Sequence, residues 1–162
     1  MKLGVICDGI SRDLSHALKV MDEFGLDYAE LQFVWDKEVG DHDASEIAQI
    51  KELLDTHNKP VSCLSRHIFA GLTTASKAGD KDHTRHMDYL KWVIEMAHQL
   101  NCPLVRIMTS KKEQILWGAN GAEHWNVAKG AWDTLPPLIA PAVDVARAEG
   151  VTLVVETGNC LL

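Results

Sequence analysis

The sequence feature that most restricts the fold is a regular alternation of short apolar segments with longer helical ones. In the helical segments, apolar residues recur at helical spacing, as with Leu14, Leu18 and Met21. Strands that alternate with helices predict a parallel sheet with helices packed on it. The five apolar segments of strand length lie at residues 3–7, 28–34, 61–64, 104–108 and 152–156.

The helical segments carry recognisable boundary signals. Asp43 and Glu46 have the spacing of a capping box, which predicts that the second helix begins near Asp43. The fourth helical region, residues 123–149, contains Pro136, Pro137 and Pro141. We expect these prolines to interrupt or restart the helix, because proline lacks the amide donor and clashes one turn back.

Two architectures fit five such strands, a doubly wound open sheet and part of a barrel. Polar side chains favour the barrel: Glu30 and Gln32, Arg106 and Glu156 each share one parity of their strand, opposite apolar neighbours. The alternative explanation is polarity at a sheet edge. The last strand has no helix after it, as in a chain cut from a longer barrel. We therefore predict an α/β fold, the N-terminal half of a (βα)₈ TIM barrel with five parallel strands, forming one incomplete domain over residues 1–162.

Composition narrows the function classes. A net charge of −7 argues against a surface built to hold nucleic acid. No apolar run has the ~18 residues of a membrane helix, and the N-terminus lacks a secretory signal. The cysteines form no CxxC pair, which favours buried thiols in a reducing cytoplasm; they are Cys7, Cys63, Cys102 and Cys160.

Candidate site residues lie where strands end. Glu156 ends the fifth strand, and a carboxylate there faces the active-site rim of a barrel, where it can bind a cation or act as a base. A structural or capping role is the alternative. His67 follows the third strand and suits proton transfer, metal binding or a hydrogen bond to substrate, although a lone histidine can also be structural.

Further residues on the same rim are candidates for substrate binding. Trp35 and Trp117 follow strands two and four and could shape a pocket or cover a sugar ring. The remaining candidates are Asp8, Lys111 and Asn159.

Three other groups have structural explanations. Glu30, Gln32 and Arg106 are expected to support the barrel floor below the site, with substrate contact as the alternative. His83 and His86 are expected on a solvated helix face rather than in a metal site. Trp92 is expected to be a packing residue.

Three stretches together resemble a known family. These are residues 25–31, residues 83–85 leading to 97–107, and residues 146–159. They resemble the xylose isomerase-like superfamily of TIM barrels, in particular the sugar phosphate isomerases and epimerases, which are related to endonuclease IV-type apurinic endonucleases. The resemblance runs over essentially the whole chain.

The resemblance implies roles for two residues. Glu156 would be a metal ligand that also moves a proton, and His67 would line the site. The other ligands would come from a missing C-terminal half. A divalent metal (Mn²⁺, Mg²⁺ or Co²⁺) would bind the substrate oxygens and stabilise an enediolate during proton transfer next to a carbonyl. The implied function is a cytoplasmic sugar or sugar phosphate isomerase or epimerase, inactive as this chain alone.

Two alternatives stay open at this point. One is an endonuclease IV-like nuclease, although the fourth strand ends in Met108-Thr109-Ser110 without the histidine that this branch would favour. The other is a non-catalytic half-barrel that binds a partner. The expected partners are a small sugar substrate and a second copy of the chain or the missing half, with no nucleic acid and no membrane.

Overall fold

The computed structural model describes residues 1–73, 75–109 and 122–156. Within these residues, five parallel strands form one sheet whose spatial order follows the chain. This order confirms the predicted barrel topology, because a doubly wound sheet would reverse its strand order at a switch point. The strands are β1 (Gly4–Ile6), β2 (Tyr28–Leu31), β5 (Val61–Ser65), β6 (Leu104–Ile107) and β7 (Thr152–Val155).

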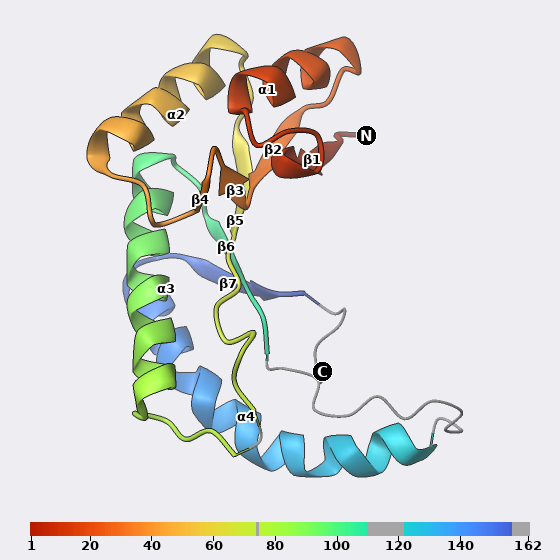
Figure 1. The fold of residues 1–162 in the computed structure, drawn as a ribbon, viewed down its shortest axis with the longest axis vertical. Coiled ribbons are helices and arrows are strands. Elements are labelled where there is room, and N and C mark those ends of the chain that lie inside the picture. The colour runs from red at the N-terminus through yellow and green to blue at the C-terminus, as the bar shows by residue number, and fades with distance from the viewer. Residues whose placement is uncertain (74, 110–121, 157–162) are drawn as a thin grey trace.

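Helices cover the outer side of the curved sheet and leave its inner side open (Figure 1). They are α1 (Leu14–Glu23), α2 (Ala44–Thr56), α3 (Lys81–Gln99) and α4 (Ala122–Ala148), and the short 3₁₀ helix η1 (Cys7–Gly9) follows β1. The strand residues that face the helices form the core. They include Ala29, Leu31, Leu64, Val105 and Ile107, each at most 1% exposed.

The capping box predicted for α2 is present. Asp43 accepts a hydrogen bond from the Glu46 amide at 2.9 Å, and Glu46 accepts one from the Asp43 amide at 2.8 Å. The two side chains thus satisfy amides that a helix start leaves without partners. None of the helices in the described part of the chain combines the length and apolar composition needed to cross a bilayer.

The segment expected to be one strand over residues 28–34 is two. β2 ends at Leu31. The next strand, β3 (Phe33–Val34), pairs antiparallel with β4 (Lys37–Glu38) after a turn of the chain. Trp35 makes the turn with a φ of 54° and donates its amide to the Arg12 carbonyl at 2.7 Å. The turn contains neither glycine nor asparagine, so the usual hairpin signal is absent from the sequence.

The expectation that prolines interrupt the fourth helix is wrong. α4 is continuous from Ala122 to Ala148 and contains Pro136, Pro137 and Pro141. The ribbon changes direction part-way along the helix (Figure 1). Each proline removes one amide donor, and a bend relieves the clash with the preceding turn, so the helix continues with a kink.

His83 and His86 are buried, not solvated as expected. The His83 ring stacks on Phe69, accepts the Gly79 amide at 3.1 Å and lies 2.8 Å from the Leu138 carbonyl. Nδ1 of His86 accepts the Phe69 amide at 3.1 Å. The two histidines thus fasten the loop after β5 and part of α4 to the first turns of α3.

Burial makes His86 a source of acid sensitivity. Burial, and then the positive charge of Arg85, lower the pKa of His86 below its ordinary value. The unfolded chain therefore binds this proton more readily, and stability falls as the pH drops below the unfolded value of about 6.5. We expect the free energy of unfolding to decline between neutral pH and pH 5, with this one group adding at most about 1.4 kcal/mol per pH unit.

Replacement by asparagine isolates that contribution. His86→Asn keeps an acceptor for the Phe69 amide but cannot titrate, so we expect a shallower pH dependence in urea titrations. His16→Asn, at an exposed position on α1, serves as the control and should keep the wild-type slope. Equal slopes for wild type and His86→Asn would contradict the assignment.

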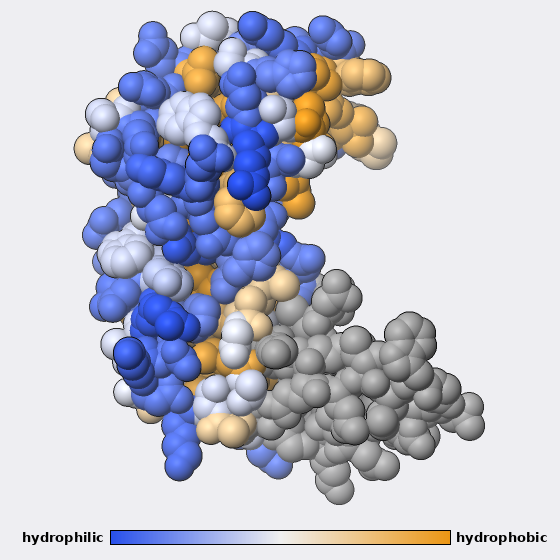
Figure 2. Space-filling view, viewed as in Figure 1, coloured by the Kyte–Doolittle hydropathy of each residue, from blue (hydrophilic) through white to orange (hydrophobic). Residues whose placement is uncertain are grey.

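The edge strands predict self-association of this chain. β1 and β7 each pair on one side only within the described residues. Leu3, which precedes β1, is 48% exposed, and Val155, the last residue of β7, is 46% exposed. Apolar side chains also gather over the β1 end of the open face (Figure 2). Unpaired edges and exposed apolar surface favour association. We expect a dimer or larger species in sedimentation velocity at micromolar concentration.

Val155→Lys should weaken this association at least tenfold, because a lysine charge on an edge strand opposes pairing. Val143→Lys, at an exposed apolar position on α4, is the matched control and should leave it unchanged. A stable wild-type monomer would refute the prediction.

Candidate functional site

The carboxyl ends of the parallel strands meet at one edge of the sheet, where a barrel carries its site. Asp8 lies in η1 directly after β1, His67 lies two residues beyond β5, and Glu156 directly follows β7. The strands before His67 and Glu156 are separated only by β6. The three residues therefore lie at the same edge, as the sequence predicted, and Asp8 accepts the Phe33 amide at 3.3 Å.

Glu156 lies on the inner face, where it forms an ion pair with Arg106 of β6. Arg106 is 9% exposed, and its parity is opposite to that of the core residues Val105 and Ile107. The predicted parity of Arg106 is confirmed. Its partner is Glu156, and Glu30 on the same face accepts a hydrogen bond from Ser65. Arg106 thus fixes the direction of the candidate ligand.

Cys63 shares this inner face but is not a candidate nucleophile. It is 8% exposed, and its sulfur lies 3.7 Å from the Ser65 hydroxyl. Burial raises the pKa of the Cys63 thiol to about 11 and that of Cys7 to about 12. Both remain protonated at neutral pH. With Cys102 they are buried free thiols, as predicted, while Cys160 lies outside the described residues.

His67 is held by two neighbours. Oε1 of Glu38 lies 2.7 Å from the His67 Nδ1 atom and also accepts the His67 amide at 3.0 Å. The Gln32 amide nitrogen lies 3.2 Å from Nε2 and 3.4 Å from Nδ1. The Phe33 ring lies 6.2 Å away, centroid to centroid. The imidazole is half-exposed but fixed in orientation by contacts from the β3–β4 hairpin.

Arg66 locks that hairpin to the end of β5. Its guanidinium donates to the Val39 carbonyl at 2.5 Å, binds Asp41 at 2.8 Å and lies 3.6 Å from the second oxygen of Glu38. Its carbon Cζ lies 4.3 Å from the centre of the Tyr89 ring on α3. Arg66 is 3% exposed, so these partners compensate the burial of its charge.

The other predicted substrate-binding residues divide into two groups. Trp35 follows β2 on the rim side, but it forms the hairpin turn, half-buried, with its ring 6.0 Å from His42 in an edge-to-face arrangement. Lys111, Trp117 and Asn159 lie outside the described residues. Of the predicted set, the structure therefore places Asp8, His67 and Glu156 at one edge, with Trp35 on the adjoining hairpin.

Sequence reasoning missed Glu38 and gave Arg66 no role. Glu38 belongs to a hairpin strand that the sequence did not reveal, so nothing placed it beside His67. The apolar run Phe33–Trp35 followed by charged residues was the available signal, but it also fits the end of a longer strand.

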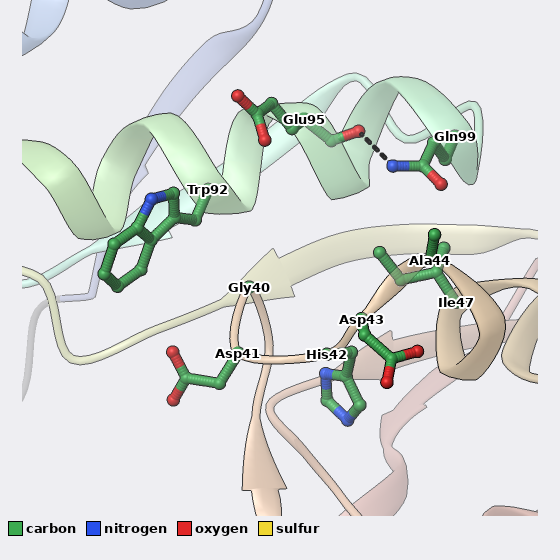
Figure 3. A pocket seen from close by; sticks show the side chains of 9 residues that line it. All are labelled: Gly40, Asp41, His42, Asp43, Ala44, Ile47, Trp92, Glu95 and Gln99. Carbon is green, nitrogen blue, oxygen red and sulfur yellow. Dashed lines mark hydrogen bonds between the residues drawn. The ribbon is translucent and has the colours of Figure 1, made fainter.

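A cavity of about 530 Å³ lies in the helix layer. Figure 3 shows it between α3, which contributes Trp92, Glu95 and Gln99, and the loop of residues 40–43. No predicted site residue lines it. Trp92, expected to pack inside, is 45% exposed here. Of the acids that line the cavity, Asp41 binds Arg66 and Asp43 caps α2, so these two serve the fold.

The described residues include no group of three or more metal-ligating side chains. Glu156 alone fits one ligand position, with an oxygen donor that divalent cations accept. A catalytic zinc site typically has three protein ligands, a number that the described residues do not bring together.

Comparison with known proteins supports the fold. A family model described as xylose isomerase-like TIM barrel matches residues 18–160. The IolI protein with a bound zinc atom has a TM-score of 0.64 and 20% identity, over 99% of this chain and 54% of that one. No curated protein matches the sequence closely enough to support an argument.

Two further solved structures share the fold. 3-Keto-D-glucoside 4-epimerase YcjR from E. coli, in its apo form, has a TM-score of 0.61 and 10% identity, over 95% of this chain and 54% of that one. AP endonuclease, family 2, from Brucella melitensis has a TM-score of 0.62 and 16% identity, over 96% of this chain and 55% of that one. This chain therefore spans about half the length of the structures it matches.

The match covers most of the chain, and the sequential strand order and outer helices agree with it. The chain belongs to the xylose isomerase-like TIM barrel family.

Proposed function

We propose that the residues at the carboxyl edge of the sheet, chiefly Glu156 and His67, form half of an active site. The enzyme is a divalent-metal-dependent isomerase or epimerase of a sugar or sugar phosphate. The reaction is proton transfer next to a carbonyl. The observation that carries the proposal is the position of Glu156, a carboxylate at the carboxyl edge of the sheet, held on the inner face by Arg106. This is where barrel enzymes of unrelated chemistry bind their substrates.

Glu156 has two proposed tasks, metal ligation and proton transfer. Arg106 is buried and forms an ion pair with the Glu156 carboxylate, whose side chain is still 42% exposed and is therefore accessible to a cation. A bound divalent cation would supply Lewis-acid polarisation of a carbonyl oxygen. Its remaining ligands would come from residues outside the described part of the chain.

His67 is the second proposed catalytic group. It is half-exposed at the same edge, and Glu38 fixes its ring, so it can exchange a proton with a substrate oxygen without first reorienting. Asp8 and Trp35, at the end of β1 and in the hairpin turn, are proposed to contact the sugar, together with Lys111, Trp117 and Asn159. The preferred substrate class is a small polyhydroxy carbonyl compound.

A nuclease is the weaker alternative. The net charge of −7 disfavours binding to a phosphate backbone. β6 ends at Ile107 and is followed by Met108 and Thr109, without a histidine. The endonuclease neighbour shares the fold at 16% identity and adds no argument about chemistry. A non-catalytic half-barrel would retain the fold but would not require Glu156.

Replacement of Glu156 tests the proposal. In the complete protein that carries residues 1–162, Glu156→Gln should lower kcat by about 10²- to 10⁴-fold, because a catalytic proton-transfer group is lost. The assay measures epimerisation or isomerisation of D-ketoses and, separately, of D-ketose phosphates in the presence of Mn²⁺, Mg²⁺ or Co²⁺. The 162-residue chain alone should bind Mn²⁺ weakly by calorimetry and show no turnover above background.

The matched control is Glu95→Gln, which removes an exposed carboxylate from α3 in the helix layer. It should leave kcat unchanged. Near-normal turnover of Glu156→Gln, with its fold intact by circular dichroism, would refute the catalytic role. Strong turnover by the 162-residue chain alone would refute the half-site.

A further inference from the structure

One carboxylate oxygen of Glu38 contacts both the backbone and the ring of His67. Oε1 of Glu38 accepts a hydrogen bond from the His67 backbone amide at 3.0 Å and lies 2.7 Å from the His67 Nδ1 atom. An ionised carboxylate can only accept hydrogen bonds, so the proton of the neutral imidazole must reside on Nδ1. Nε2 is then left with a lone pair.

The Gln32 amide agrees with this tautomer. Its nitrogen, a donor, lies 3.2 Å from Nε2 and 3.4 Å from Nδ1 of His67. Because Nδ1 already donates to Glu38, only Nε2 can accept from Gln32. Gln32 is itself tied to the hairpin, since its carbonyl accepts the Val39 amide at 2.9 Å.

Glu38 is in turn held in place. Its strand β4 pairs with β3, its side chain is 17% exposed, and the buried Arg66 guanidinium lies 3.6 Å from its second oxygen. Arg66 also donates to the Val39 carbonyl next to Glu38. A carboxylate anchored on both sides imposes its geometry on the imidazole, as an orienting partner of a catalytic histidine does.

We propose that Glu38 is a positioning residue that keeps His67 in the Nδ1–H tautomer, with Nε2 as the base for a substrate hydroxyl that takes the place of the Gln32 amide at this nitrogen. In the step, the substrate O–H bond breaks, its electron pair stays on oxygen, and a new N–H bond forms at Nε2. The imidazolium that results lies against the Glu38 carboxylate, which stabilises its charge. The catalytic use of His67 rests on the proposed function, but the tautomer does not.

The tautomer is measured directly by two-bond ¹H–¹⁵N correlation spectra of the histidine rings, in the 162-residue chain without metal or substrate. His67→Gln identifies the His67 signals by their loss. The wild type should show the Nδ1–H pattern at pH values where the imidazole ring is neutral. An Nε2–H pattern in the wild type would overturn the proposal, whatever the variants do.

Variants then assign the effect to Glu38. Glu38→Ala should reverse the preference to Nε2–H, whereas Glu38→Gln should preserve Nδ1–H because its amide oxygen still accepts. Asp36→Asn, an exposed acid in the turn of the same hairpin, should change nothing. Retention of Nδ1–H in a folded Glu38→Ala would overturn the proposal.

Steady-state kinetics of the Glu38 variants distinguish failure of the positioning role from failure of the proposed function. In the complete protein, Glu38→Ala should lower kcat at least tenfold with a smaller change in KM, with partial rescue by Glu38→Gln. Unchanged kcat in Glu38→Ala would overturn the positioning role. Absence of isomerase activity in the wild type would refute the proposed function while leaving the tautomer result to stand.

Discussion

The structure depends on the division of each strand into two chemically different faces. Leu31, Leu64, Val105 and Ile107 point outward and are fully buried beneath the helices. Parallel strands are stable where such apolar faces are covered. The polar strand residues Glu30, Ser65 and Arg106 lie on the opposite, inner face. The candidate site is a consequence of this separation, because the chain has nowhere else to place Arg106 and its partners.

A second constraint is the buried charge of Arg66, which joins three parts of the fold. It contacts the loop after β4 through Asp41, the hairpin through Val39, and α3 through Tyr89. Gly40 allows this approach: its φ is +92°, and a Cβ there would lie 2.9 Å from Val93 and 3.2 Å from the Arg66 guanidinium. The same junction holds Glu38 beside His67, so support of the fold and orientation of the site share their contacts.

Predictions from the sequence succeeded where a single periodic signal decides the structure. Strand alternation predicted the sheet order, parity predicted the inner position of Arg106, and the Asp43–Glu46 spacing predicted the start of α2. They failed where longer-range contacts decide. His83 and His86 occupy helix positions that resemble a solvated face, but the loop after β5 folds over them. The prolines of α4 bend the helix without ending it.

The sequence by itself determined the fold class, the order of the strands and the edge at which Glu156 and His67 lie, because these follow from local periodicity and from the common direction of parallel strands. Only the tertiary structure decided which side chains meet. Glu38 and His67 are 29 residues apart, and their contact depends on a hairpin turn without a sequence signal. Pairing between distant residues is set by the closure of the whole chain, which no local pattern encodes.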